Sequence, residues 1–499
     1  MPPDEFGGSY ESECRPGGPY GALKLVIQAL INIFRSPDLR NRVIFTLSML
    51  VIYRVGFFVP LVGVDQTALS EAAEDNAGGF GRFLEYASIF TGGDFGQSTI
   101  FGLGIMPYIT AAIIFQLLQT AVPRLQELKK EGASGQQKIT EWTRYATIGL
   151  CVIQGMMWLK YMEARGIVQD QFSQPPNKLL FYFAGITALA AGSMFLMWLG
   201  EQIDKYGIGN GVSLILTAGI ISRMPNAVMW IWNNFDPSQQ SEAKTLGVMG
   251  LIFLVGAFVF VVAGAILITV AQRRIPIQQA KHTRGRKVYG GQRHYLPLRI
   301  NHAGVMPIIF ASSLMIFPSA IFGWMNTQAA LTPSEVWYSW WPTVTGFLST
   351  SFQIGEYPYV ICSIVLIYFF SYFWTTVVFS PDEMSKQLRD HGSFIPGLRP
   401  GPRTAEYLET VMERVTYVGA GFLAIIAIIP SIVAKEMSIP FFVASFLGGT
   451  GLLIVVSVGL DLMQRIEANL LMRNYSGFLS RGESRSGGRS QRLKGPRRA

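Results

Sequence analysis

The sequence predicts an all-α membrane protein that crosses the bilayer about ten times. Hydrophobic residues make up 50% of the 499-residue chain, and only 15% of its residues are charged. Most of the hydrophobic residues lie in runs of roughly 20, the length of α-helix that crosses about 30 Å of hydrocarbon. The cations collect between these runs and at the chain ends, which is typical of a polytopic protein oriented by its loops.

Ten segments have the length and composition of a membrane span. In chain order they are residues 43–60, 100–122, 146–161, 179–199, 212–232, 246–270, 305–324, 359–378, 415–433 and 441–460. Residues 22–34 also show helical apolar spacing but are too short to span, so we expect an interfacial helix within an amphipathic segment, 22–42. Residues 1–21 are rich in Gly, Pro and Glu and predict a disordered extension.

The distribution of charge supports this number of spans, because basic segments fall on one side only if the number is right. The segments that we assign to the cytoplasm are residues 35–42, 124–144, 272–299 and 465–498. The first external segment is acidic and has Arg82 as its sole cation. Residues 200–211 are a weak exception, since they are assigned inside but carry Glu201 and Asp204 against Lys205. Both termini are therefore expected in the cytoplasm.

Residues 272–299 form a strongly basic loop between the sixth and seventh predicted spans. The loop contains no Asp or Glu, and its eight cations are Arg273, Arg274, Lys281, Arg284, Arg286, Lys287, Arg293 and Arg299. A loop of this charge is held on the cytoplasmic side of the membrane. Its charge also suggests a docking surface.

Several classes of function are disfavoured by the composition. The net charge of +9 comes from loops and chain ends, where membrane orientation explains it better than nucleic-acid binding does. The three cysteines have no CxxC spacing, and the four histidines have no partner at metal-ligand spacing. The stretch GASGQQK, residues 132–138, lacks the Gly-Lys-Ser/Thr end of a phosphate-binding loop. We therefore expect no metal site, no cofactor and no enzymatic activity.

Helix-breaking residues interrupt several predicted spans. Pro107, Pro307 and Gly449 are examples, and such breaks are tolerated in lipid where protein or a water-filled cavity meets the freed backbone groups. Each break alone is common in membrane helices, so only the set favours an internal pathway. Ionisable residues inside the spans are nearly absent, with Arg54 in the outer part of the first span. This scarcity disfavours the main alternative, an ion-coupled solute transporter of inverted-repeat type. A membrane scaffold without conduction has no feature in its support.

Six long motifs carry a resemblance to a known family. They lie at residues 100–119, 128–147, 194–215, 272–299, 394–408 and 448–470. The first reads IFGLGIMPYITAAIIFQLLQ and the last reads GGTGLLIVVSVGLDLMQRIEANL. In these motifs the chain resembles the SecY family, the channel-forming subunits of bacterial protein translocases. The resemblance extends from about the first predicted span to the end of the tenth.

This resemblance implies ten helices in two pseudo-symmetric inverted halves, 43–232 and 246–470, around a central hourglass pore with a lateral gate. Such a subunit is a passive channel that conducts unfolded secretory polypeptides across the bacterial plasma membrane and releases transmembrane segments sideways into lipid. The SecA ATPase or a translating ribosome supplies the driving force. The further partners it implies are the SecE and SecG subunits, signal sequences and nascent polypeptides, SecDF, YidC and anionic lipids.

The resemblance also implies a ring of aliphatic side chains at the constriction of the pore. The ring residues are Ile105, Ile109, Val212, Leu216, Ile309 and Ile454. Val212 and Leu216 stand where the family usually has isoleucine, which leaves the ring aliphatic and bears only on its tightness. By spacing alone these residues fit ordinary packing between helices as well, so the assignment depends on the resemblance.

Two movable parts are implied by the same resemblance. The plug, a short helix that blocks the closed pore, would occupy about residues 79–98 and use Phe83, Leu84, Tyr86, Ile89 and Phe90. Gln116 and Asn301 match polar positions along the lateral gate, where an amide pair holds two helices together by about 0.6 to 2 kcal/mol. His302 departs from the family pattern beside this gate.

Cytoplasmic partners are implied at two loops, residues 272–302 and 380–414. The basic residues that match the ribosome and SecA contacts are Arg274, Arg286, Lys287 and Arg399. Most loop cations are explained by membrane orientation, but Arg399 lies in a loop whose net charge is negative. It is therefore the strongest candidate for a contact. Residues 471–499 are expected to form a basic disordered tail.

Overall fold

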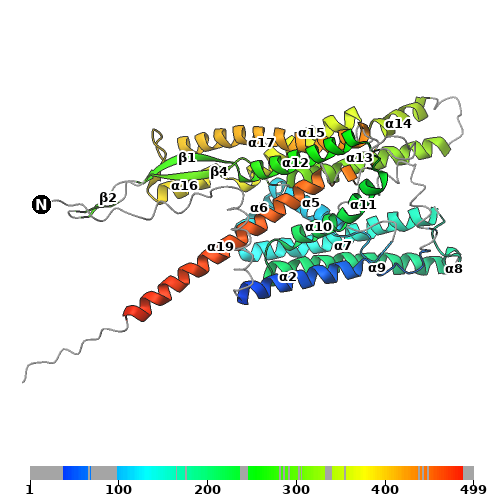
Figure 1. Cartoon of the computed structure of the whole chain (residues 1–499), viewed down its shortest axis with the longest axis horizontal. Helices are drawn as coiled ribbons and strands as arrows, with labels where there is room; N and C mark the ends of the chain where they lie inside the picture. Colours follow the sequence, from blue (N-terminus) through cyan, green and yellow to red (C-terminus); the bar gives the residue numbers. More distant parts are fainter. Residues whose placement is uncertain are drawn as a thin grey trace, which may run out of the picture.

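The described part of the chain is mostly helical. The computed structural model describes residues 37–65, 68, 98–236 and 246–486, apart from positions 165, 175–176, 280–281, 285–286, 290–292, 302–303, 305, 332–339, 353–355, 437–438, 441–442, 445 and 447–448. Its helices form two groups that lie one over the other, and α19 (Thr450–Ser486) crosses between them (Figure 1). A helix lies in each of the ten predicted spans, which agrees with the predicted fold class.

The first group comes from the N-terminal half of the chain. It consists of α2 (Pro37–Gly56), α5 (Met106–Ala121), α6 (Pro123–Lys130), α7 (Ala133–Ala164), α8 (Asp170–Ser173), α9 (Asn177–Tyr206), α10 (Gly211–Ser222) and α11 (Met224–Asn234). Helix α9 packs against α2, α7 and α10, and α5 packs mainly against α7. This half is therefore organised around α7 and α9.

The second group comes from the C-terminal half. Its helices are α12 (Val248–Val270), α13 (Met306–Leu331), α14 (Trp340–Ser351), α15 (Tyr357–Val378), α16 (Pro381–Asp390) and α17 (Pro402–Glu436). Helix α15 lies between α13 and α17. Helix α19 packs against α12 in this group and against α10 in the first, so it joins the two halves.

Proline determines where two helices are interrupted. Pro123 begins α6 directly after α5, and the two helix axes differ by 98°. Pro225 lies in the first turn of α11, which follows α10 after a break at Arg223. Proline lacks a backbone N–H and restricts the residue before it, so in both places it starts a new helix.

A small antiparallel sheet extends from the second group, and the sequence analysis did not predict it (Figure 1). Its strands are β1 (Gln272–Gln279), β4 (Arg293–Arg299) and β5 (Ser393–Phe394), in the order β4, β1, β5. Strands β2 (His282–Arg284) and β3 (Lys287–Tyr289) pair beyond it. In the register, Gln272 lies opposite Arg299 and Gln278 lies opposite Arg293. The strongly basic loop is thus a β-hairpin.

One face of this hairpin is buried against helices. Ile275 and Leu298 lie in an apolar cluster with Leu388 of α16 and with Leu408 and Met412 of α17. The cluster attaches the hairpin to the start of α17. The hairpin, α16, β5 and the first turns of α17 form one packed unit, which we name the platform.

Two expectations on the extent of the helices need qualification. Among the described residues, five helices are long and apolar enough to cross a membrane, or six if α5 and α6 make one bent span, so the number ten stays a prediction. Helix α19 continues to Ser486, so the expected start of a disordered tail at residue 471 falls inside a helix. Once formed, a helix propagates at little cost through residues such as Leu, Met and Arg.

An ion-paired cluster ties α7 to α9 beyond the end of the third predicted span. The carboxylate of Glu163 accepts hydrogen bonds from Lys178 and from the hydroxyl of Tyr182. Both hydrogen bonds lower the pKa of Glu163 below its usual value, and the bond from Lys178 has the larger effect. The ionised carboxylate therefore stabilises the folded state.

We expect this cluster to make stability depend on pH in the acid range. The pKa of Glu163 is lower in the folded than in the unfolded state, so its contribution is complete above the unfolded value of about 4.3 and is lost as the pH falls below it. The side chain is about a third exposed, so the effect should stay within about 1 kcal/mol. Thermal unfolding of purified protein between about pH 3 and 6 checks this, with a shallower decline expected for Glu163→Gln. The control is Glu409→Gln. If the stability of Glu163→Gln declines as steeply as that of the parent or of this control, the assignment is contradicted.

Candidate functional site

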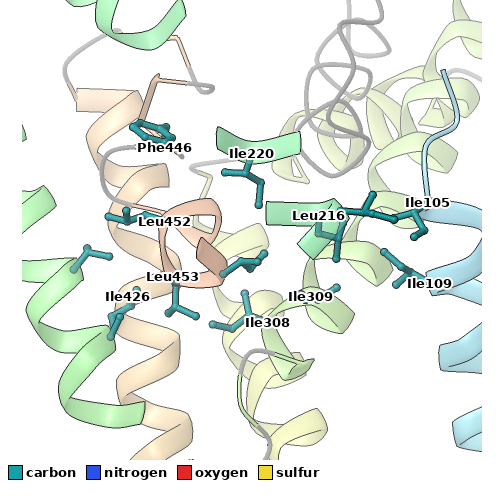
Figure 2. Packing of buried hydrophobic residues seen from close by; sticks show 14 of the residues in the cluster. Ile105, Ile109, Leu216, Ile220, Ile308, Ile309, Ile426, Phe446, Leu452 and Leu453 are labelled. Carbon is teal, nitrogen blue, oxygen red and sulfur yellow. The ribbon is translucent and has the colours of Figure 1, made fainter. Parts of the chain in front are cut away.

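Five of the six predicted ring residues are buried where the two halves meet. Ile105 and Ile109 come from the start of α5, Leu216 from α10, Ile309 from α13 and Ile454 from α19. All five belong to one apolar cluster, and Val212 is partly buried against it. In Figure 2, Ile105 and Ile109 lie to the right of Leu216 and Ile309 lies below it, and all four belong to this cluster. The structure thus brings all six predicted ring residues together, from four elements far apart in the sequence.

The first turn of α10 is held tightly against α9. Asp204 Oδ1 accepts a hydrogen bond from the Gly211 N–H at 2.7 Å, and Asn210 Oδ1 caps the helix by accepting from the Ser213 N–H at 3.1 Å. A Cβ atom at Gly211 would lie 2.0 Å from the carbonyl oxygen of Gly200. Only glycine permits this approach. These contacts determine where Val212 and Leu216 lie.

Tight turns position the ring residues before α5. The Gly102 N–H donates to the Thr99 carbonyl at 2.8 Å, and the Gly104 N–H donates to the Phe101 carbonyl at 2.7 Å. Gly104 has a φ of 56°, in the left-handed region that favours glycine. Pro107 lies in the first turn of α5, where no N–H is needed. The break predicted at Pro107 is thus the beginning of α5.

A cavity of about 230 Å³ lies against three of the six ring residues. Leu216, Ile309 and Ile454 line its buried end. Its opposite end carries exposed polar and charged side chains, which are Arg299, Asp461, Gln464 and Arg465. The cavity therefore has a charged mouth and three aliphatic side chains at its buried end. Polar side chains also line it, namely Asn210, Ser213, Thr269, Asn301 and Ser457.

The mouth of the cavity is braced by side-chain contacts. Arg465 Nε donates to Asp461 Oδ2 at 2.8 Å within α19. Arg299 Nη2, at the end of β4, donates to Gln464 Oε1 at 3.1 Å. The second contact joins the platform to α19 beside the cavity. Exposed pairs of this kind contribute little stability, so the mouth can rearrange at low cost.

The two predicted gate residues are not hydrogen-bonded to each other. The Asn301 amide donates to the Gly304 carbonyl at 2.7 Å and so stabilises the turn that leads into α13. Gln116 lies on α5, and its buried Oε1 has no hydrogen-bond partner in the part of the chain that the structure describes. Asn301 also lines the cavity. His302 is outside the described residues.

Arg399 lies at the surface of the platform. Its loop leaves β5 at Ile395, which is buried in the platform cluster, and enters α17 at Pro402. The Arg399 side chain is exposed and forms no ion pair with the described residues. Arg274 is also exposed, on β1. Lys287 lies in β3, whereas Arg286 is outside the described residues.

The plug expected at residues 79–98 lies outside the described residues except for Ser98. Its five candidate side chains, Phe83, Leu84, Tyr86, Ile89 and Phe90, therefore have no structural description here.

Sequence analysis overlooked two charged groups that the structure makes prominent. Arg223 lies at the break between α10 and α11, inside the predicted fifth span. Glu201, which was noted only for its charge, accepts hydrogen bonds from Arg144 Nη2 at both carboxylate oxygens, at 2.6 Å for Oε1 and 2.7 Å for Oε2. The pair joins α7 to α9 near α10. The charges of both groups were visible in the sequence, but their partners were not.

Comparison with known proteins identifies one family over most of the chain. A family model described as SecY matches residues 99–463. The chain is 37% identical over 461 residues to the protein translocase subunit SecY of Chlamydia trachomatis, covering 91% of this chain and 98% of that protein. It is also 37% identical over 452 residues to the protein translocase subunit SecY of Escherichia coli K12, covering 91% and 96%.

Solved structures share the fold at lower identity. One described as the structure of a protein conducting channel matches with a TM-score of 0.56 and 17% identity, covering 86% of this chain and 92% of that chain. Sec61 in the canine ribosome-channel complex matches with a TM-score of 0.53 and 16% identity, with the same coverage. These likenesses extend the fold to distant channels.

Proposed function

This chain belongs to the SecY family, and from that premise we propose the route by which a polypeptide crosses it. The protein is a channel-forming membrane subunit of a protein translocase rather than an enzyme. The passenger is an unfolded secretory polypeptide that enters from the charged mouth of the cavity and passes between the ring residues. A transmembrane segment instead leaves sideways into lipid, between α5 and α13.

The observation that supports this route is the cavity that ends on Leu216, Ile309 and Ile454 at the junction of the two halves. A narrow aliphatic neck sheds water when it is empty, so it resists ions while the channel is closed. Aliphatic groups form no hydrogen bond that would favour one passenger side chain over another. Both properties suit a channel that must pass many different sequences and leak little.

The movable parts complete the proposal. Residues 79–98 act as the plug on the external side of the ring. Gln116 and Asn301 lie on the two sides of the lateral gate. Asn301 bonds within its own turn, and Gln116 Oε1 has no partner among the described residues, so the gate can separate without loss of a shared hydrogen bond. The energetic cost of opening then falls on apolar contacts, which a signal sequence can replace with its own.

Cytoplasmic partners bind the platform. The SecA ATPase or a ribosome contacts Arg274, Arg286, Lys287 and Arg399, whose planar guanidinium groups or ammonium groups suit carboxylate and phosphate. SecE and SecG assemble with the chain in the membrane, and SecDF, YidC and anionic lipids are further partners. The protein lies in a bacterial plasma membrane with both termini in the cytoplasm, as its basic segments indicate.

Site-specific photo-cross-linking from Ile109 tests the route. A secretory chain is stalled partway across vesicles that contain the translocase, and the probe at position 109 is activated. We expect adducts with the stalled passenger, because Ile109 is buried at the junction of the halves, on the proposed route.

The matched control is a probe at Phe183, which is 71% exposed on α9 and should react with lipid. Adducts from position 109 with lipid or neighbouring helices alone would return Ile109 to a packing role and favour the solute transporter.

A further inference from the structure

We infer that Thr404 and Ser385 are positioning residues that hold the Arg399 loop in the shape its partner binds. The inference deepens the proposed function and rests on it, because it takes the loop as the contact for a motor ATPase. The partner chemistry is a carboxylate or phosphate group that the Arg399 guanidinium grips through two parallel hydrogen bonds. Such a grip depends on the direction of the side chain, so the backbone beneath it matters.

The backbone at Arg399 is restrained from both sides of one proline. The Thr404 hydroxyl donates to the Arg399 carbonyl at 2.9 Å, just before Pro400. The Ser385 hydroxyl donates to the Gly401 carbonyl at 2.8 Å, just after it. The two hydroxyls come from different helices, α17 and α16. Both carbonyls that flank Pro400 are thereby fixed to the body of the platform.

The loop needs these restraints because its own sequence leaves it free to vary. Gly397 has a φ of 88° and Gly401 a φ of 128°, so glycine allows the chain to turn on each side of Arg399. Pro400 confines Arg399 to an extended backbone, but the glycines on either side leave the direction of this segment relative to the platform free. The buried Ile395 and the partly buried Leu398 anchor the side of the loop that faces the platform.

The two hydroxyls are buried, unlike the group that they position. Thr404 is 2% exposed and Ser385 is 4% exposed, while the Arg399 side chain is in solvent. The Ser385 bond spans 16 positions in the sequence, so it is no local helix contact. Thr410, on the same helix as Thr404, donates instead to the Glu406 carbonyl four residues earlier, a common contact within helices. Thr410 therefore provides a matched control.

The test measures the binding of purified SecA to vesicles that contain the assembled translocase, together with ATP-driven export. Thr404→Val keeps the shape of the side chain and removes the hydroxyl. We expect it to weaken binding about five-fold, the effect of one hydrogen bond of ordinary strength. Ser385→Ala should weaken binding to a similar degree, Thr404→Ser should restore it, and Thr410→Val should leave it unchanged.

A double substitution separates a positioning role from a general loss of stability. If Thr404 acts through Arg399, then adding Thr404→Val to Arg399→Ala causes no further loss of binding. An additional five-fold loss in that background, or parent-like binding by both Thr404→Val and Ser385→Ala, overturns the inference. If Arg399→Ala itself binds SecA normally, the docking site in the proposed function is wrong, and the inference fails with it. If Arg399→Ala weakens SecA binding but Thr404→Val and Ser385→Ala do not, the docking site stands and only the role of the two hydroxyls is wrong.

Discussion

Replacing Arg399 with glutamate should abolish ATP-driven export while membrane insertion and assembly stay intact. The side chain is exposed and forms no ion pair with the described residues, so its loss leaves no buried charge in this part of the fold. At the contact that we propose with SecA, the substitution would remove two charge-assisted hydrogen bonds and place like charges together. A loss of about 2–5 kcal/mol is typical of such a change. This corresponds to roughly 30-fold or more in affinity.

Export of a labelled presecretory protein into vesicles measures this effect, and the amount of assembled complex measures folding. The control is Arg389→Glu, which makes the same change of charge on the neighbouring α16, where Arg389 is already paired with Asp390 at 3.4 Å. Undiminished export by Arg399→Glu would remove Arg399 from the contact. Equal losses in the two variants would indicate a general effect of charge on the platform.

Replacing Gly211 with alanine should destabilise the closed channel strongly. The added Cβ would lie 2.0 Å from the Gly200 carbonyl oxygen and 2.7 Å from its carbonyl carbon, and both are backbone atoms that cannot rotate away. Relief requires that the start of α10 move away from α9, and Val212 and Leu216 move with it. Overpacking of this kind costs about 1–3 kcal/mol, and we expect the upper end of that range.

Thermal unfolding in detergent measures the loss of stability, and ion conductance of vesicles measures the displaced ring. We expect a lower unfolding temperature and a raised conductance without any passenger. Gly459→Ala on α19 is the control, because its added Cβ would meet no neighbouring group within 4 Å outside the backbone of its own helix, and helix propensity alone should stabilise it slightly. A Gly211→Ala protein as stable and as tight as this control would contradict the close packing of α10 on α9.

The helices could be predicted from the sequence because lipid imposes a simple requirement on length and polarity. A chain that must satisfy its backbone hydrogen bonds internally forms helices wherever about 20 apolar residues follow one another. The strands of the platform could not be predicted from length and polarity in this way. Its strands alternate at Ile275 and Ile277 and again at Leu296 and Leu298, but a run of cations surrounds these pairs and hides the period of two. The pairing of β1 with β4 and β5 is a long-range contact that composition does not reveal.

The meeting of the ring residues could be predicted even less from the sequence. Ile105 and Ile109 have the spacing of one helix face, which fits packing as well as it fits a pore. Only the three-dimensional structure places them in one apolar cluster with Leu216, whose side chain lines the cavity, and no local pattern could have predicted that meeting. The bond from Thr404 to the Arg399 carbonyl was likewise hidden, since threonine in a helix ordinarily bonds within its own helix.

The aliphatic floor of the cavity has a consequence for friction. A carbon–carbon contact is worth only about 0.1–0.2 kcal/mol, less than thermal energy, so a sliding chain crosses each contact without a separate barrier. A hydrogen-bonding neck would instead arrest the chain at every matching residue. The rate of transport would then depend on the motor and on the length of the passenger. The neck itself would slow all passenger sequences to the same small degree.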